Sequence, residues 1–279
     1  MQVIRSLSAL RAWRTEQPDV GLVPTMGNLH EGHIELVRVA RRHGETVATT
    51  IFVNPTQFGP NEDFAAYPRT LDADLEQLER AGNNMVFVPD VESMYPDGPT
   101  QTRVLPGPLA NELCGAHRPG HFDGVLTVVS KLFHLVQPRF ACFGRKDFQQ
   151  LTLIRQMVRD LNFPVEIVPV PIVRANDGLA LSSRNIYLGA DERARALALP
   201  RTLQWLAETL RAAPDDVARI EAQALDRLRA AGFVPDYVSV RTEPNLVSAQ
   251  HARGALIVLA AARMGKTRLI DNLCFELPA

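Results

Sequence analysis

The sequence predicts an α/β protein: a doubly wound, parallel, Rossmann-like sheet with a second, smaller α+β domain. Apolar runs such as Thr46–Val53 (TVATTIFV) are continuous and β-branched, as in strands buried on both faces of a parallel sheet. Such runs alternate with helical patterns as far as residue 173, which indicates βαβ units. After Arg174 two helical stretches precede three strand candidates, so we expect domains over residues 1–174 and 175–279.

The elements of the first domain follow from local patterns. Short apolar runs predict strands at Val20–Pro24, Thr46–Val53, Met85–Val88, Phe140–Phe143 and Val165–Val173. Apolar residues at helical spacing predict helices at Glu31–His43, Thr70–Ala81, Val125–Val136 and Phe148–Leu161. Gly82 is a natural stop for the second of these helices, and Pro138 follows the third.

The second domain is predicted to place helices before strands. We expect helices near Asp191–Ala212 and Asp215–Ala231, and strands near Tyr237–Arg241, Ala255–Ala262 and Thr267–Asp271. The tripeptide 265–267 (GKT) looks like the end of a phosphate-binding P-loop, but the first glycine of that motif would fall at Ala260. We therefore predict a turn between two strands there.

Composition excludes several classes of protein. The 279 residues are 46% hydrophobic and 22% charged, which is typical of a folded globular chain. Thirty Lys and Arg against 31 Asp and Glu leave a net charge of −1, which argues against a protein that coats nucleic acid or an anionic membrane. The longest apolar run, Ala255–Ala262, is far shorter than the about 20 residues of a membrane span. Three distant cysteines and no signal-peptide pattern lead us to expect a cytoplasmic protein.

The loop Pro24–His33 is the first candidate for chemistry. It follows a predicted strand, and ligands of open parallel sheets bind beyond the carboxyl ends of the strands. The loop turns through Gly27 and enters a helix, whose first N–H groups and positive dipole end suit a phosphate. Gly32 stands between His30 and His33, and imidazole N–H groups can donate to phosphoryl oxygens as charge develops. This pattern predicts a nucleotide-binding loop.

Three further loops carry polar side chains at predicted strand ends. In the loop 54–59, Gln57 can bind hydroxyl, carboxylate or amide groups without adding charge. In the loop 144–150, Lys146 can act as a point charge on phosphate. The segment 181–185 (LSSRN) offers hydroxyls and a guanidinium that can wrap a polyphosphate, and its place at a domain joint suits a lid.

Metal binding is a second interpretation of the histidines. His30 and His33, together with His117 and His121, could supply four ligands to zinc. We disfavour this interpretation, because the sequence has no HExxH motif and because no cysteine lies close to His30 and His33. The Pro-Gly-containing segment 118–121 (RPGH) is instead expected to border the nucleotide site.

Together these loops resemble a known family. The strings PTMGNLHEGH, IFVNPTQF, YPRT, RPGHFDGV, FGRKDFQQ and DGLALSSRN occur in this order between residues 24 and 185, and RLIDN follows at residues 268–272. They resemble the pantoate–β-alanine ligase (pantothenate synthetase) family, within the nucleotidyltransferases that carry a His-x-Gly-His-type motif. The resemblance implies ATP-dependent condensation of (R)-pantoate with β-alanine through a pantoyl adenylate, with release of AMP and pyrophosphate. It also implies Mg²⁺ with ATP and a homodimer.

The resemblance implies roles for individual residues. The catalytic set is His33 as proton donor, His30 on the reacting phosphate, and Lys146 and Arg184 on the developing charge. Gln57 and Gln150 bind pantoate, and Gln57 also binds β-alanine. The implied ATP contacts are Met26, Gly27, Asn28, Leu29, His30, Glu31, Gly32, His33, Gly144, Arg145, Lys146, Asp147, Val173, Leu181, Ser182, Ser183 and Arg184. The implied Mg²⁺ ligands are not identified.

Two departures and two alternatives accompany the resemblance. Arg145 stands where the family often has an acidic or amide residue, and Leu181 stands where some members have methionine, an exchange of similar volume. Another nucleotidyltransferase, acting on a phosphate-bearing substrate, would share the histidine loop but would not predict Gln57 and Gln150. A nucleotide-binding module without activity would bind ATP and not turn it over.

Overall fold

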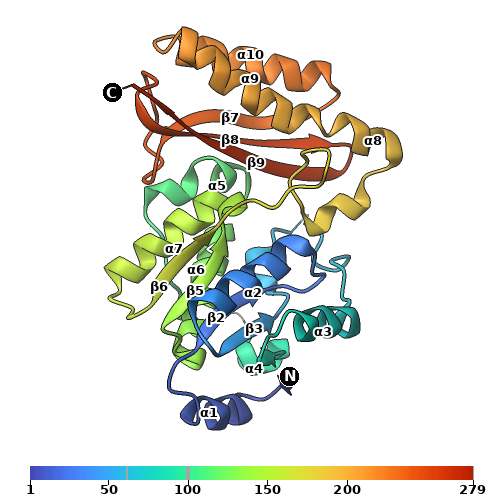
Figure 1. Cartoon of the computed structure of the whole chain (residues 1–279), viewed down its shortest axis with the longest axis vertical. Helices are drawn as coiled ribbons and strands as arrows, with labels where there is room; N and C mark the ends of the chain where they lie inside the picture. The colour runs from blue at the N-terminus through green and yellow to red at the C-terminus, as the bar shows by residue number, and fades with distance from the viewer. Residues whose placement is uncertain (61, 99–100, 279) are drawn as a thin grey trace. The chain divides into compact units, whose positions relative to one another are not determined.

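The computed structural model describes residues 1–60, 62–98 and 101–278 (Figure 1). By its contacts the chain divides into two compact units, residues 1–145 with 153–171 and residues 146–152 with 172–279. The sequence predicts domains 1–174 and 175–279, whereas the contacts place the segment 146–152 in the second unit. Two hydrogen bonds account for this placement: Asn272 donates to the Lys146 carbonyl at 2.9 Å, and Thr152 donates to the Pro244 carbonyl at 3.3 Å.

The first unit is built on a six-stranded sheet of order β1-β4-β3-β2-β5-β6, and its strand pairs are parallel. The strands are β1 (Gln2–Ile4), β2 (Gly21–Thr25), β3 (Val47–Ile51), β4 (Met85–Phe87), β5 (Phe140–Gly144) and β6 (Glu166–Val170). The chain places β3 and β4 on one side of β2 and β5 and β6 on the other. The order therefore reverses between β2 and β5, and ligands of such sheets bind at this point, beyond the carboxyl ends of the strands.

Helices join these strands. They are α1 (Leu7–Thr15), α2 (Glu31–His43), α3 (Leu71–Arg80), α4 (Val91–Met94), α5 (Cys114–His117), α6 (His121–Val136) and α7 (Phe148–Asp160), with short 3₁₀ turns η1 (Pro55–Gln57), η2 (Pro108–Asn111) and η3 (Arg145–Asp147). Val23 and Val47 of the central strands are fully buried, and Ile34 and Val37 of α2 pack in the same core cluster. The continuous apolar strands are thus covered on their faces, as the sequence predicts.

The second unit is an antiparallel sheet of order β7-β8-β9 with helices packed on it. Its elements are η4 (Ser183–Tyr187), α8 (Ala190–Arg195), α9 (Ala198–Ala212), α10 (Val217–Ala230), β7 (Val234–Thr242), β8 (Gly254–Met264) and β9 (Thr267–Leu277). Leu206 of α9, Ile220 of α10 and Val258 of β8 are fully buried in one cluster. The predicted fold class, a doubly wound parallel sheet with a smaller α+β part, is confirmed.

Several local predictions need correction. The single helix expected over Asp191–Ala212 is two helices, because Pro200 has no N–H to donate to the Ala196 carbonyl and its ring would collide with that carbonyl in a continuous helix. Strand β9 runs to Leu277, beyond the expected end at Asp271. The strand β1 and helix α1 were not predicted. The turn expected at residues 265–267 is confirmed as a hairpin between β8 and β9, with Gly265 at a φ of +57°.

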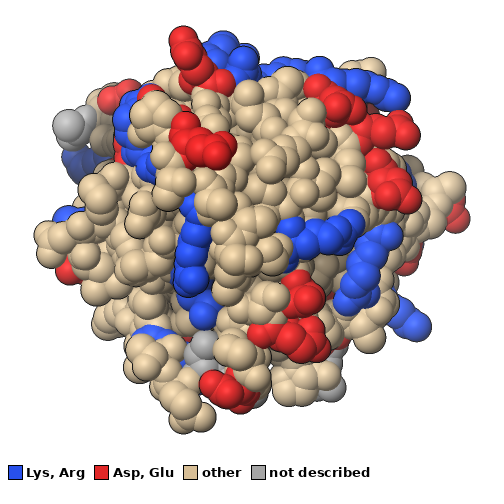
Figure 2. Space-filling model, turned by 90° about the horizontal axis from the view of Figure 1, so that it is seen from below, with Lys and Arg blue, Asp and Glu red and all other residues tan. Residues whose placement is uncertain are grey.

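The face shown in Figure 2 carries both basic and acidic side chains. Basic and acidic side chains there are interspersed among uncharged ones, in keeping with the net charge of −1. Among the described residues, no helix combines the length and the apolar character that crossing a membrane requires.

Candidate functional site

The loop after β2 ends in a pair of mutually capped histidines. His30 is the N-cap of α2, and its Nδ1 accepts the Gly32 N–H at 3.1 Å. The Nδ1 of His33 accepts the His30 N–H at 3.2 Å, and the two rings lie 4.1 Å apart between centroids. A ring nitrogen that accepts an N–H carries no proton, so each neutral imidazole has its proton on Nε2. The start of α2 therefore presents two Nε2–H donors.

A buried carboxylate shapes the backbone of this loop. Asp74 of α3 is 1% exposed, and its two oxygens accept the N–H groups of Asn28 at 2.9 Å and Leu29 at 2.8 Å. It also accepts the Thr70 hydroxyl at 3.1 Å. Gly27 and Asn28 have φ of +81° and +49°, so the chain turns sharply where the carboxylate holds it. Asp74 was not among the predicted site residues, although an acid between Leu71 and Leu78 on the apolar face of a helix was a readable signal.

The loop after β3 places Gln57 beside the first loop. Asn54, 1% exposed, donates to Gln57 Oε1 at 3.1 Å and to the Gly124 carbonyl at 3.2 Å. Its own oxygen accepts the Tyr95 hydroxyl at 2.7 Å, and burial raises the pKa of Tyr95, which keeps this donor neutral. Gln57 Nε2 lies 3.0 Å from Met26 Sδ. The predicted pantoate-binding glutamine and the predicted nucleotide loop are therefore in contact within the first unit.

The segment 118–124 packs against the turn that contains Gln57. His121 Nδ1 lies 2.8 Å from the Gln57 main-chain oxygen, and Arg118 pairs through two contacts of 2.6 Å with Glu62. Burial acts to raise the pKa of Glu62, but the hydrogen bonds and charge of Arg118 outweigh it and hold that pKa below its usual value. A Cβ on Gly124 would lie 2.2 Å from the Thr56 carbonyl oxygen, so α6 packs directly on the main chain of the Gln57 turn.

The zinc interpretation gains no support from these contacts. Both nitrogens of His121 are engaged, Nδ1 with the Gln57 carbonyl and Nε2 with Arg118 at 2.9 Å. Within residues 1–60, 62–98 and 101–278, no group of three or more His, Cys, Asp or Glu side chains is arranged to hold a metal ion.

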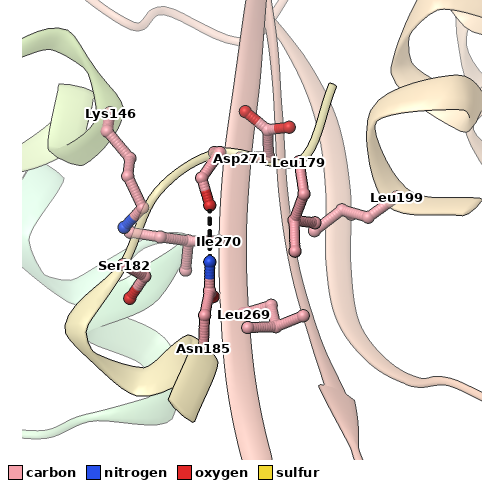
Figure 3. A pocket seen from close by; sticks show the side chains of 9 residues that line it. Lys146, Leu179, Ser182, Asn185, Leu199, Leu269, Ile270 and Asp271 are labelled. Atoms are coloured by element: carbon pink, nitrogen blue, oxygen red, sulfur yellow. Dashed lines mark hydrogen bonds between the residues drawn. The ribbon is translucent and has the colours of Figure 1, made fainter. Parts of the chain in front are cut away.

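The second unit contains a pocket that two of the predicted site residues, Lys146 and Ser182, help to line (Figure 3). It is lined by Lys146, Leu179, Ala180, Ser182, Asn185, Leu199, Leu269, Ile270 and Asp271. In Figure 3, Lys146 and Ser182 lie on one side of the β9 ribbon and Leu179 and Leu199 on the other. Asn185 donates to the Ala180 carbonyl at 3.0 Å, while its buried Oδ1 has no hydrogen-bond partner among the described residues. The pocket thus combines a cation, a hydroxyl, the carboxylate of Asp271 and an unused acceptor with an apolar wall.

The segment leading to this pocket is a short hairpin. The Leu181 N–H donates to the Val173 carbonyl at 3.0 Å, and Arg174 and Ala180 form a β-bridge. Ser182 then caps η4, accepting the Arg184 N–H at 3.3 Å. The residues of this region that were predicted to contact ATP therefore lie on one continuous hairpin and turn: Val173, Leu181, Ser182, Ser183 and Arg184.

Comparisons with known proteins identify the family. The family described as pantoate-beta-alanine ligase matches residues 2–274. The chain belongs to the pantoate–beta-alanine ligase family. Pantothenate synthetase of Chromobacterium violaceum is 54% identical over 273 residues, covering 98% of this chain and 99% of the relative. Pantothenate synthetase of Neisseria meningitidis serogroup A is 53% identical over 278 residues and covers 100% of both chains.

Solved structures of the same family share the fold. Pantothenate synthetase from Thermus thermophilus aligns with a TM-score of 0.92 at 46% identity, over 98% of this chain and 99% of that one. Pantoate-beta-alanine ligase from Francisella tularensis, complexed with beta-gamma ATP and beta-alanine, aligns with a TM-score of 0.83 at 33% identity, over 98% and 97%. The resemblance drawn from the loops is confirmed, and so is the ligase class of the chain.

The site residues predicted for this pantoate–β-alanine ligase are divided between the two units. In the first unit lie the nucleotide loop 26–33, Gln57, Gly144 and Arg145. The second unit contains Lys146 and Asp147 in η3 and Gln150 in the first turn of α7. It also contains the hairpin with its turn. Within the first unit, the loop 26–33 contacts Gln57 through Met26. Within the second unit, Lys146 and Ser182 line one pocket.

Proposed function

We propose that this chain joins (R)-pantoate to β-alanine at the expense of ATP, through an enzyme-bound pantoyl adenylate. The observation that carries the proposal is the family match over residues 2–274. The Francisella tularensis relative, whose complex contains an ATP species and β-alanine, supports ATP and β-alanine as substrates. Pantoate as the third substrate follows from the family.

In the first step the pantoate carboxylate attacks the α-phosphorus of ATP, and pyrophosphate leaves. The carboxylate is already a nucleophile, so the protein has to orient the reactants and stabilise the charge that collects on the phosphate oxygens. The Nε2–H groups of His30 and His33 are suited to this task, because the start of α2 adds the positive end of a helix dipole. His33, the proton donor that the resemblance implies, is proposed to direct its Nε2–H at a phosphate oxygen as a hydrogen-bond donor, and His30 is proposed to stabilise the charge on the reacting phosphate.

The second unit is proposed to hold phosphate oxygens as well. Lys146 supplies a point charge and Ser182 a hydroxyl to the same pocket, and Arg184 follows on η4. Lys146 Nζ lies 3.9 Å from Asp147 Oδ2, so a carboxylate of the same turn limits its range. The remaining ATP contacts implied by the resemblance are part of this proposal.

Pantoate is proposed to bind through the neutral amides of Gln57 and Gln150. Amides can accept from and donate to the hydroxyls of pantoate without adding a charge that competes for the phosphates. In the second step the neutral amine of β-alanine, held near Gln57, attacks the acyl carbon of the adenylate. The C–N bond forms, the bond from carbon to the phosphate oxygen breaks, AMP leaves, and the nitrogen loses one proton to solvent.

Three further assignments belong to the proposal. Mg²⁺ is proposed to enter with ATP, since phosphate oxygens supply most of its ligands in nucleotide sites. The protein is proposed to be a homodimer, which light scattering tests. A cytoplasmic location is proposed from the three widely separated cysteines and the enzyme class.

The test is an assay with each of the three substrates omitted in turn. Pantothenate, AMP and pyrophosphate are expected together only when ATP, pantoate and β-alanine are all present. ATP and pantoate alone should release about one pyrophosphate per active site, because the adenylate stays bound. Equal ATP consumption without pantoate would overturn the proposal. Pyrophosphate release with a phosphate-bearing substrate would favour another nucleotidyltransferase activity.

A further inference from the structure

The RLIDN motif at residues 268–272 lies in β9, and three of its residues line the pocket, but the chemistry described above assigns it no role. Its last residue, Asn272, is 3% exposed, and its side-chain Nδ2 donates to the main-chain oxygen of Lys146 at 2.9 Å. The two residues are 126 positions apart in the chain. The amide thus connects the last strand of the second unit to the turn that carries the proposed phosphate-binding lysine.

An ion pair between a buried carboxylate and a partly buried arginine holds this strand in place. The side chain of Asp271 is 1% exposed and pairs with Arg174 through two contacts, at 2.7 and 2.9 Å. Asp271 Oδ1 also accepts the Asn272 N–H at 2.8 Å, and Arg174 donates to the Asn272 carbonyl at 3.2 Å. The main chain of Asn272 therefore donates to one member of the pair and accepts from the other, which restricts where its side chain can point.

The same ion pair reaches the hairpin. Arg174 donates to the Gly178 carbonyl at 3.1 Å and forms the β-bridge with Ala180. The hairpin leads directly into Ser182, which lines the pocket together with Lys146 and Asp271. One buried cluster thus touches the main chain of both pocket-forming segments.

Anchoring the main chain matters for a lysine. Its charge sits at the end of a flexible four-carbon stem, and η3 is a 3₁₀ turn of three residues with little stiffness of its own. The Lys146 side chain is 18% exposed, so it already lies largely within the protein. Fixing its carbonyl fixes the origin of the stem and narrows the volume that the ammonium group samples.

We propose that Asn272 is a positioning residue for Lys146, and that the Asp271–Arg174 pair holds Asn272 and the hairpin in the geometry in which Lys146 and Ser182 share one pocket. The proposal rests on the proposed function, in which Lys146 acts on the phosphates of ATP. A displacement of about 1 Å in such a group can reduce a rate about 100-fold.

The test is a double-mutant cycle of Asn272→Ala and Lys146→Ala, read by pantoate-dependent exchange of pyrophosphate into ATP, which reports the first step alone. Asn272→Ala should lower the exchange rate constant about 10- to 100-fold and leave the KM for β-alanine unchanged in the full reaction. The double variant should be no slower than Lys146→Ala, within about twofold, because the amide acts through the lysine. Val258→Ala, in the core of β8, is the control for loss of stability alone.

The possible results separate the proposed function, the role of Lys146 and the positioning role of Asn272. A wild-type chain that makes no pantothenate refutes the proposed function, and Lys146→Ala at wild-type rate refutes the role of the lysine and the positioning with it. If the function and the role of Lys146 are both supported, two results refute the positioning role of Asn272 without touching them. One is a wild-type exchange rate in Asn272→Ala, and the other is a double variant whose loss of rate equals the product of the two single losses. If thermal unfolding shows Asn272→Ala to be unfolded, Asn272→Ser is run through the same cycle and judged by the same criteria.

Discussion

His121 lies between the main-chain oxygen of Gln57, 2.8 Å from its Nδ1, and the guanidinium of Arg118, 2.9 Å from its Nε2. Because the guanidinium can only donate, Nε2 is the acceptor and the proton lies on Nδ1, which donates to Gln57. The imidazole thereby connects the Arg118–Glu62 pair by hydrogen bonds to the turn that contains Gln57. This is the opposite tautomer to that of His30 and His33, whose protons lie on Nε2.

Removing His121 should loosen the pantoate site. In His121→Ala the Gln57 carbonyl loses its shorter hydrogen bond and keeps the longer one from Arg118, at 3.4 Å. We expect the KM for pantoate to rise about tenfold, the size of one lost hydrogen bond. The KM for ATP should change much less. Steady-state kinetics with each substrate varied measure this difference. His134→Ala, an exposed position on the same helix α6, is the control, and equal effects in both variants would contradict the role given to His121.

The Glu62–Arg118 pair predicts a pH-dependent stability. The pKa of Glu62 is lowered in the folded protein, so its contribution is fully present above its unfolded pKa of about 4.3 and is lost as the pH falls through the folded pKa. Glu62→Gln should lower the free energy of unfolding at pH 7 by about 1–2 kcal/mol. Denaturant titrations at pH 7 and at about pH 3 measure the difference. A gap between wild type and variant that stays constant over this range would contradict the assignment.

Asp74 is expected to set the geometry of the histidine loop. In Asp74→Asn, an NH₂ group faces a main-chain N–H that the carboxylate oxygen accepted, so two donors oppose each other. We expect a loss of about 1–3 kcal/mol in stability and a fall in kcat of about 100-fold. Thermal unfolding and single-turnover rates measure the two effects separately. Asp72→Asn, exposed on the same helix, should change neither, and a wild-type kcat in Asp74→Asn would show that the loop does not need the carboxylate.

His30 allows the cap to be separated from the chemistry. Asparagine is a good N-cap, so His30→Asn should keep the stability of α2 within about 0.5 kcal/mol, whereas His30→Ala should cost about 1 kcal/mol. Both variants lose the Nε2–H donor, so both should slow adenylate formation about 100- to 1,000-fold. Circular dichroism melts and single-turnover pyrophosphate release provide the two readouts. Normal turnover in His30→Asn would mean that the histidine serves only as a cap.

Local features of the fold were readable from the sequence because they depend on neighbours in the chain. The buried strands of the first unit appear as continuous apolar runs, and Gly27 with the helix start at Glu31 marks the nucleotide loop. The break before α9 can also be read from the sequence, since Pro200 cannot extend a helix that begins before it. The prediction of one helix over Asp191–Ala212 used apolar periodicity alone and missed this break. Strand β9 was underestimated because its buried centre is polar, with Asp271 and Asn272 at 2% and 3% exposure.

The sequence by itself determined the family, the parallel sheet and the loops that carry the candidate chemistry, because motif strings and apolar periodicity are local and survive without coordinates. Only the tertiary structure decided what holds those loops. Asp74 meets Asn28 across 46 positions, Arg174 meets Asp271 across 97 and Asn272 meets Lys146 across 126. Each contact includes a buried polar group, Asp74, Asp271 or Asn272, whose desolvation must be offset by a specific partner. The choice of partner is made by packing rather than by any spacing along the chain.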